Sequence, residues 1–531
     1  MATDRRYIRH VFGGGWATDF GPSVDAVPDQ TGRVSLPFLV DADNCEYELD
    51  GGPHKIGGLA RLNSTTIESG EEIRGLVDYW RQGTSGSPSQ KRVVHAGTKI
   101  LKDDADGTFT SIFTGLEDGA IPSYTTFDDL LIISSSSTTD VPKSWDQTTA
   151  QDLAGTPPNF AFAVVHKDKV YAAGVASAPS TLYYSDTFDP ENWTTGDSGS
   201  IQVDPGDGDS ITGLVSHKGE LWVFKGPYKG SIHRVTGTSS SSLAKVPYIK
   251  GIGAVAHNTI FKFRDDIGFM WSDGTVRSLN ATAAFGDYLE GSLSLSINKY
   301  LMDHVNADLL KQAWAVDHPT KGQVIISLPV DSSSTNNLVL AMDYRFGRDP
   351  IAMRWAPWPA IAAGAVARVI DPTNNNQPNI FFGGNDGFVR KSNQATRAID
   401  GSTAITATIT TPFINYGLPI EEKEISIASV GISPKGNYTG TFGWQRDDNA
   451  QQTQSFDQGG GDVLGVAAAN QFTLGTSQLA GSQFVDRFMD LEEGGLFRSV
   501  QYQVTNAGVS EDLEVHSIAA AINSAGWSTE N

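Results

Sequence analysis

Cysteine is almost absent from this chain of 531 residues, in which Cys45 is the single cysteine. One cysteine cannot form an intramolecular disulfide, and no group of cysteines and histidines has the spacing of a structural zinc site. Packing must therefore stabilise the fold. Long apolar stretches are also missing, since the longest weakly polar segment, residues 359–370, is too short to span a bilayer. No signal-peptide pattern follows Met1. We expect a soluble protein without a membrane span.

Basic residues are in the minority. The chain has 39 Lys and Arg against 61 Asp and Glu, which gives a formal net charge of -22. A protein that grips nucleic acid neutralises phosphates with a concentrated basic surface, and this composition argues against that class. An acidic surface has two interpretations. It keeps a large protein soluble, or it lines a passage that DNA traverses without sticking, and the sequence leaves both open.

Catalytic motifs are lacking as well. The sequence has no His-Glu-x-x-His helix, no Gly-x-Ser-x-Gly elbow between a strand and a helix, and no phosphate loop that ends in Lys-Ser/Thr. The Ser-x-Asp turn of sialidase propellers does not occur at Ser185, because residue 187 is Thr instead of Asp. The ten histidines are scattered, and several fall at predicted turns, where an exposed ring needs no special role. We predict no catalytic residue, no cofactor and no enzymatic activity.

One loop gathers carboxylates in a way that suits calcium. Asp204, Asp207 and Asp209 lie within six residues, and oxygen ligands on a short loop are what calcium binds, although the distal Glu of a full calcium loop is missing. Residues 103–107 form a poorer version of the same pattern. Asp and Gly are also ordinary turn residues. We predict no metal site, with the loop of Asp204 as the one calcium candidate.

A recurring hairpin is the strongest positive signal. Glycine is abundant, at 56 residues, and only 19% of residues are charged, which favours short strands and turns. In segments 165–171 and 216–222, a residue pair His-Lys forms the predicted turn, and apolar and aromatic residues follow it in the next strand. His217 lies 51 residues after His166. Looser copies occur at residues 94–101, 127–132, 263–269, 316–325 and 369–382. Such a period is typical of propellers and solenoids.

A second hairpin completes some of these units. Segments 270–277 and 384–390 carry an Asp-Gly turn, and two hairpins give the four strands of a propeller blade. Other units close with an aromatic stretch, as at residues 182–193, whose large rings we expect to pack one blade against the next. Successive hairpins lie 32 to 53 residues apart. The sequence therefore predicts an all-β fold with a β-propeller of six to seven unequal blades over residues 86–413.

The segments on either side of the repeat differ from it. Residues 1–85 are rich in Pro, Gly and Asp and predict an extended N-terminal arm with the first strands. Residues 425–432 and 500–504 alternate between apolar and polar side chains, which predicts half-buried strands of a small C-terminal β-domain over residues 414–531. Within it, the Gln, Gly and Asp content of residues 451–465 predicts a mobile loop.

In order and spacing, several segments resemble the β-propeller tail proteins of bacteriophages. The resemblance covers about residues 40–400, and its segments are Asn44-Cys45, Asp50-Gly51-Gly52, Gly57-Gly58, residues 73–76, 93–98, 182–185, 189–193, 211–214, 221–225 and 232–235. In short-tailed phages such a protein is the tail nozzle, also called the packaged-DNA stabilisation protein.

The resemblance implies a ring, commonly a homohexamer, below the portal and adaptor proteins, with tail fibres or spikes as further partners. It implies that double-stranded DNA passes through without specific binding, and that the protein is made in the host cytoplasm and located in the virion tail. In that setting, carboxylates that face the channel would repel phosphates and keep DNA mobile during ejection.

Three functions therefore remain open. The first is a structural virion protein that extends and closes the DNA channel, retains packaged DNA and lets it pass at ejection. The alternative is a glycan-binding or glycan-cleaving propeller that acts on the host surface, for which the spatial separation of paired carboxylates would be decisive. A cellular interaction scaffold fits the repeat but explains neither the arm nor the C-terminal domain.

Overall fold

The chain forms two compact units. The computed structural model describes residues 6–21, 23–24, 33–83, 86, 88–104, 107–285, 291–347, 352–393, 396–459, 484–491 and 495–526. One unit comprises residues 61–340 and 361–392, and we refer to it as the propeller unit. The other comprises residues 1–60, 341–360 and 393–531, and we refer to it as the sheet unit.

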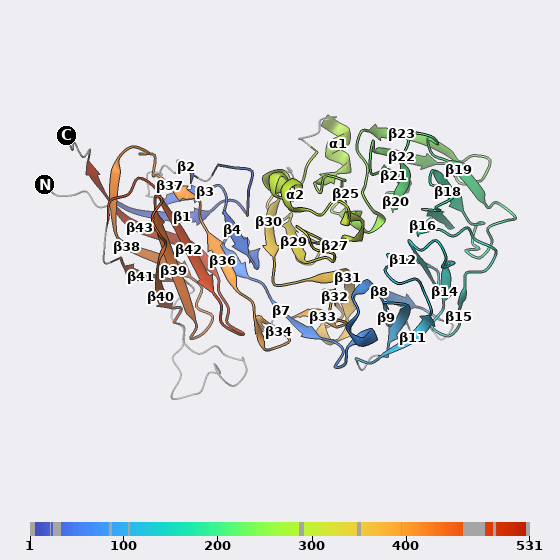
Figure 1. Ribbon diagram of the computed structural model, residues 1–531, viewed down its shortest axis with the longest axis horizontal. Coiled ribbons are helices and arrows are strands. Elements are labelled where there is room, and N and C mark those ends of the chain that lie inside the picture. The colour runs from blue at the N-terminus through green and yellow to red at the C-terminus, as the bar shows by residue number, and fades with distance from the viewer. Residues whose placement is uncertain are drawn as a thin grey trace. The chain divides into compact units, whose positions relative to one another are not determined.

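Seven antiparallel sheets follow one another along the described part of the propeller unit (Figure 1). The first sheet contains β8 (Ile73–Arg81), β9 (Ser89–Ala96), β10 (Lys99–Asp103) and β11 (Phe109–Thr114), and the second contains β12 (Pro122–Phe127), β13 (Leu130–Ser135), β14 (Lys143–Trp145) and β15 (Ala150–Asp152). The third contains β16 (Phe162–His166), β17 (Lys169–Ala173), β18 (Thr181–Tyr184) and β19 (Gly199–Gln202), and the fourth contains β20 (Ser210–His217), β21 (Glu220–Gly226), β22 (Ser231–Thr236) and β23 (Ala244–Lys250).

The last three sheets are less regular. They contain β24 (Phe261–Phe263), β25 (Asp266–Met270) and β26 (Val276–Ser278); β27 (Trp314–His318), β28 (Gln323–Leu328) and β29 (Leu338–Asp343); and β31 (Ala363–Asp371), β32 (Gln377–Gly384) and β33 (Val389–Asn393). The helices α1 (Leu279–Phe285) and α2 (Asn298–His304) lie between the fifth and sixth sheets in the chain. The first strands of most neighbouring sheets contact each other, the 3-10 turn His257–Thr259 contacts both β20 and β27, and β31 of the last sheet packs beside β8 of the first. The predicted all-β propeller is confirmed.

The predicted hairpins coincide with turns between paired strands. In the two best copies, both central turn residues have positive φ: Lys167 and Asp168 in one, Lys218 and Gly219 in the other. Positive φ at both positions matches the twist of the strands that such a turn joins. Six hairpins join the first and second strands of a sheet. The hairpin after His95 instead joins β9 and β10, the second and third strands, and this shift explains the short spacing of 32 residues to the next copy.

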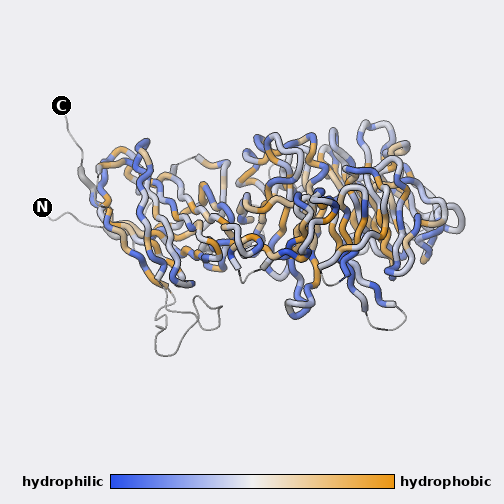
Figure 2. Tube along the Cα trace, turned by 60° about the horizontal axis from the view of Figure 1, so that its bottom comes forward, coloured by the Kyte–Doolittle hydropathy of each residue, from blue (hydrophilic) through white to orange (hydrophobic). Residues whose placement is uncertain are grey.

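Apolar side chains fill the spaces between neighbouring sheets. One cluster joins the first and second sheets around Tyr79 and Trp145, and another joins the second and third around Phe160 and Trp193. The rings of Phe160 and Trp193 lie 5.4 Å apart. The aromatic residue of segment 182–193 therefore packs between blades, as predicted. Figure 2 shows hydrophobic stretches of the trace alternating with hydrophilic ones, many of which lie at bends.

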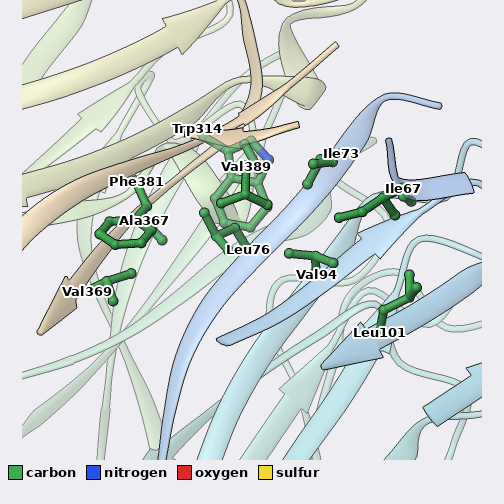
Figure 3. Close-up of a cluster of buried hydrophobic side chains, with 12 residues drawn as sticks. Ile67, Ile73, Leu76, Val94, Leu101, Trp314, Ala367, Val369, Phe381 and Val389 are labelled. Carbon is green, nitrogen blue, oxygen red and sulfur yellow. The ribbon is translucent and has the colours of Figure 1, made fainter. Parts of the chain in front are cut away.

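A further cluster closes the ring between the last sheet and the first. Phe381 and Val389 of the last sheet pack with Leu76 and Val94 of the first (Figure 3). The chain just before β8 adds hydrogen bonds to the last sheet. The backbone N–H of Leu62 donates to the carbonyl of Val389 at 2.8 Å.

Asn63 extends this closure with its side chain. It accepts from the Val389 N–H at 2.8 Å and donates to the Gly387 carbonyl at 3.0 Å. Gly387 has φ of 75°, and a Cβ there would lie 2.7 Å from the carbonyl oxygen of Ile67, so this turn requires glycine. Residues 61–81, which we assigned to the N-terminal arm, are therefore part of the propeller unit.

The sheet unit is built from both ends of the chain. Its strands are β1 (Arg6–Phe12), β2 (Ser23–Val24), β3 (Arg33–Leu36), β4 (Asp41–Asp43), β5 (Cys45–Tyr47), β6 (Pro53–Lys55), β7 (Gly58–Arg61), β30 (Arg354–Trp358), β34 (Ala398–Ile399), β35 (Thr403–Ala404), β36 (Ala407–Thr410), β37 (Phe413–Ile414), β38 (Glu422–Ile432), β39 (Thr439–Arg446), β40 (Gln452–Asp457), β41 (Val485–Asp490), β42 (Val500–Asn506) and β43 (Val515–Gly526). One sheet has the order β3-β1-β43-β38-β41, and a second contains β2-β37-β42-β36-β4 with β39 and β40.

This arrangement differs from the predicted boundaries of 1–85, 86–413 and 414–531. The first strand, β1, lies between β3 and β43, which pair with its backbone along both edges. The N-terminal segment is therefore a component of the C-terminal domain's sheet. The predicted strands at 425–432 and 500–504 are confirmed as β38 and β42. The predicted loop begins with β40, which pairs with β39, while residues 460–465 lie outside the described residues.

Candidate functional site

The propeller unit contains a pocket of about 300 Å³ at the end of the ring where several first strands begin. Its wall comes from the starts of β12, β16 and β20 and from two short 3-10 turns, His257–Thr259 and Leu310–Gln312. The first strands of a propeller converge on the axis, so residues from three sheets and from two short turns meet at one place. A concave site with a few polar groups is the usual place for a ligand.

His257 is the central polar residue of this pocket. Its ring stacks on Phe162, with ring centroids 4.9 Å apart and planes 7° from parallel. The Leu214 backbone N–H donates to Nδ1 at 3.3 Å, which leaves the proton of the neutral ring on Nε2. Burial lowers the pKa of His257 to about 4, so the ring is neutral at physiological pH.

Asn258 links two parts of the propeller beside this pocket. Its side-chain Nδ2 donates to the carbonyl of Pro122 at 3.0 Å, which links the segment before the fifth sheet to the first strand of the second sheet. Ser123 and Thr212 add hydroxyl groups to the lining, and Lys311 adds an ammonium group. Among the described residues that line the pocket, none is Asp or Glu. The pocket can therefore offer hydrogen bonds and one positive charge, but its lining holds no pair of carboxylates for acid-base glycoside hydrolysis.

The calcium candidate Asp204, Asp207 and Asp209 is engaged by the protein's own donors. Asp209 accepts from the backbone N–H groups of Tyr228, at 2.9 Å, and of Gly230, at 2.7 Å. Asp204 pairs with Lys245, and Asp207 pairs with Lys225.

Lys225 occupies the position that a cation would take in this loop. Its buried Nζ lies 2.7 Å from Asp207 Oδ2 and 2.8 Å from each of the carbonyl oxygens of Val203 and Asp204. This oxygen cage resembles the ligand set that suggested calcium, with an ammonium group inside it. In the second loop, Asp103 pairs with Arg92 and Asp104 with Lys102, while Asp106 lies outside the described residues.

Two of the hairpin histidines do not have the exposed positions that we expected. His95 and His166 are buried, because the turn regions pack against neighbouring sheets. Burial lowers the pKa of each ring to about 4. These histidines are therefore structural, neutral groups of the propeller.

A second polar cluster lies in the sheet unit and was not predicted. Glu48, His54 and Glu514 each place one possible metal-binding atom within 4.8 Å of the others. His54 is buried, and its Nδ1 lies 2.8 Å from Glu48 Oε1. Burial alone lowers the pKa of His54, but hydrogen bonds to Asp512 and Glu48 outweigh it and raise the pKa to about 9. Residues 54 and 514 are far apart in the sequence, so no spacing motif could have revealed the cluster.

Comparisons with known proteins assign no family to the chain. No family model matches it, and no curated protein matches it. Similar solved structures include YCF48 bound to a D1 peptide, with a TM-score of 0.35, 9% identity, and coverage of 71% of this chain and 97% of that one. A gluconolactonase of Xanthomonas campestris has a TM-score of 0.33 and 12% identity, covering 70% of this chain and 98% of that one. An exo-beta-1,3-galactanase of Phanerochaete chrysosporium has a TM-score of 0.28 and 8% identity, covering 88% and 100%.

No helix among the described residues is long and apolar enough to cross a membrane.

Proposed function

We propose that this chain is a structural, non-enzymatic component of a phage virion, the tail nozzle that its sequence resembles. The observation that carries the proposal is the apolar surface of the sheet unit. Among the described residues, its exposed large hydrophobic side chains are Phe20, Leu49, Leu418, Ile420, Phe484, Phe488, Leu496 and Val509. Apolar side chains that gather into a patch are typical of surfaces that bind other proteins, and in this proposal the eight side chains contribute to such a surface. A ring of subunits between further tail proteins requires such surfaces.

The axis of the propeller is not the proposed DNA path. Asn258 and Pro122 are bonded across the pocket, and the Phe162–His257 stack lies beside them. A duplex cannot pass through a space of about 300 Å³. The channel would instead lie on the axis of a ring of subunits, where the net charge of -22 favours an acidic, non-adhesive wall.

Electron microscopy of the purified chain, combined with light scattering of the same sample, tests the proposal. We expect closed rings, with an acidic lumen. The variants Ile420→Ser and Phe488→Ser should weaken assembly, because both side chains are 65% exposed in the sheet unit. Phe188→Ser is the control, since Phe188 is 71% exposed in the propeller unit. A strictly monomeric protein, or rings with a basic lumen, would contradict the nozzle.

A glycan-binding propeller is the second candidate, and the axial pocket favours it. The pocket combines a stacked aromatic pair, hydroxyl groups, the Asn258 amide and the Lys311 ammonium group. These groups suit recognition of a small polar ligand. Without carboxylates in its described lining, binding is favoured over cleavage.

Calorimetry with host-surface oligosaccharides tests this candidate. We expect binding that weakens at least tenfold in Lys311→Ala and stays unchanged in Lys321→Ala, a lysine of the β27–β28 turn region outside the pocket. Release of reducing sugar should not be detected. Absence of binding would remove the glycan candidate and leave the ring experiment unaffected.

A further inference from the structure

We propose that Glu48, His54 and Glu514 form a binding site for one divalent transition-metal ion, with zinc as the best-suited ion. The site lies wholly in the sheet unit and does not depend on either proposed function. Its donor set is one imidazole nitrogen and two carboxylate groups, with the three donor atoms within 4.8 Å of one another. Zinc binds such nitrogen and oxygen donors, and sites with three protein ligands keep a fourth position for water or substrate.

The backbone brings two of the three ligands together. His54 belongs to β6, and it forms an antiparallel bridge with Glu514 just before β43. The adjacent Lys55 N–H donates to the carbonyl of Leu513 at 2.9 Å. The two ligands are therefore neighbours on paired backbones, although the chain between them includes the whole propeller unit.

A tight turn brings the third ligand, Glu48, beside His54. The Glu48 N–H donates to the Gly52 carbonyl at 2.9 Å, and the Gly51 N–H donates to the Glu48 carbonyl at 2.8 Å. Gly51 has φ of 93°, and a Cβ there would lie 2.4 Å from the carbonyl oxygen of Phe12. Glycine at this position allows the turn that places Glu48 beside His54.

The groups behind His54 orient its ring for metal binding. While Nδ1 faces Glu48, Nε2 lies 2.9 Å from Asp512 Oδ1. Arg397 Nη2 lies 2.9 Å from the same Nε2 and also donates to Asp512 Oδ2 at 3.0 Å. Metal-bound histidines commonly donate their second ring N–H to a carboxylate, which fixes the tautomer and the ring plane. The Asp512–Arg397 pair would therefore present Nδ1 to a metal ion.

Glu514 is positioned in a similar way. Ser433 Oγ donates to its Oε1 at 2.9 Å, and Lys435 Nζ lies 2.6 Å from its Oε2. His516 Nε2 lies 2.8 Å from Oε1, and Asp50 holds the other ring nitrogen of His516 at 2.6 Å. The carboxylate is buried and its orientation is fixed by three neighbours.

Charges of both signs surround the site. Asp512 pairs with Arg397 and Glu514 with Lys435, while Glu48 and Asp50 pair with the imidazoles of His54 and His516. The ammonium group of Lys55 and the carboxylate of Glu511 are both bonded to the Asn506 side chain. A divalent ion would bind by displacing the proton between His54 Nδ1 and Glu48.

Titration of the full-length, EDTA-treated chain with zinc, followed by calorimetry, tests the proposal. We expect saturable binding of one ion per chain. Glu48→Gln should weaken binding at least tenfold, and Asp512→Asn should weaken it by about 10- to 100-fold, as expected when the partner of a metal-bound histidine is lost. His304→Gln is the control, because His304 forms an exposed pair with Asp331 at 2.7 Å and belongs to no three-ligand group among the described residues.

Cobalt provides a readout that does not depend on how the variants fold. Added to the wild-type chain, cobalt should give the visible absorption bands of a low-coordinate site with nitrogen and oxygen ligands, and zinc should abolish them by displacement. The proposal would be overturned if the wild-type chain bound no zinc at one equivalent, or if folded Glu48→Gln bound zinc as tightly as wild type.

Discussion

His166 Nδ1 and Ser216 Oγ lie 2.8 Å apart and join the first hairpin of the third blade to the first hairpin of the fourth. The connection continues around the ring, because Lys218 Nζ donates to the carbonyl of Asp265 in the hairpin of the fifth blade at 2.7 Å. The repeated His-Lys turns therefore bind to one another. They act as links between blades as well as turns within them.

Removing the first of these links should destabilise the propeller unit. In Ser216→Ala the buried ring of His166 loses its hydrogen-bond partner, and we expect the free energy of unfolding to fall by about 1–3 kcal/mol. Urea denaturation measures it. Ser200→Ala, at an exposed position of β19, should change it by less than about 0.5 kcal/mol. Equal effects of the two variants would show that the link contributes nothing.

The ring-closing cluster should be sensitive to loss of a large side chain. Phe381 is fully buried between the last and first sheets, so Phe381→Ala should lower the free energy of unfolding by about 3–5 kcal/mol. Phe188→Ala removes an equally large but exposed ring and is the matched control. If calorimetry showed similar melting temperatures for the two variants, the cluster could not be what closes the ring.

Lys225 should be required for the loop that carries Asp204, Asp207 and Asp209. Lys225→Met leaves the Asp207 carboxylate and two carbonyl groups without their cation, and we expect a loss of about 3–5 kcal/mol. Lys229→Met is the control, because only the backbone N–H of Lys229 contacts the loop, at 2.9 Å from Asp209 Oδ2.

Calcium provides a second test of the same loop. Because the Lys225 ammonium group already lies among the loop oxygens, calcium should leave the melting temperature of the wild-type chain unchanged. A calcium-dependent rise that is lost in Asp207→Asn would show instead that the ion displaces Lys225.

Acidification below about pH 6.5 should destabilise the chain through its buried histidines. Burial lowers the pKa of His95 and His257 to about 4 in the folded state, whereas the unfolded value is about 6.5. The unfolded chain therefore binds protons first as the pH falls, and stability is lost between about pH 6.5 and pH 4. Each such histidine contributes a slope of about 1.4 kcal/mol per pH unit within that window.

Denaturation curves at several pH values measure this slope. His95→Gln removes one of the titrating groups, so its stability should fall less steeply than that of wild type below pH 6.5. The exposed His304 is the site for a control substitution, His304→Gln. A slope unchanged in His95→Gln would contradict the assignment.

The local pattern of the sequence was sufficient to predict the propeller. Short turns such as Lys167-Asp168 and Lys218-Gly219 reverse the chain within a few residues, so the residues that form them also specify them. The aromatic stretch that ends at Trp193 likewise predicted packing between blades. The strands β38 and β42 followed from simple alternation of apolar and polar residues.

Tertiary structure decided everything that depends on contacts between distant segments. Nothing near Arg6 to Phe12 in the sequence shows that this strand pairs with the C-terminal β43, because β pairing depends on which edge the folded chain makes available. Asn63 closes the ring against Val389 for the same reason. The loop carboxylates were visible in the sequence, but only the fold revealed that Lys225, from β21, supplies their cation. His54 and Glu514 meet through a backbone bridge that the sequence does not encode locally.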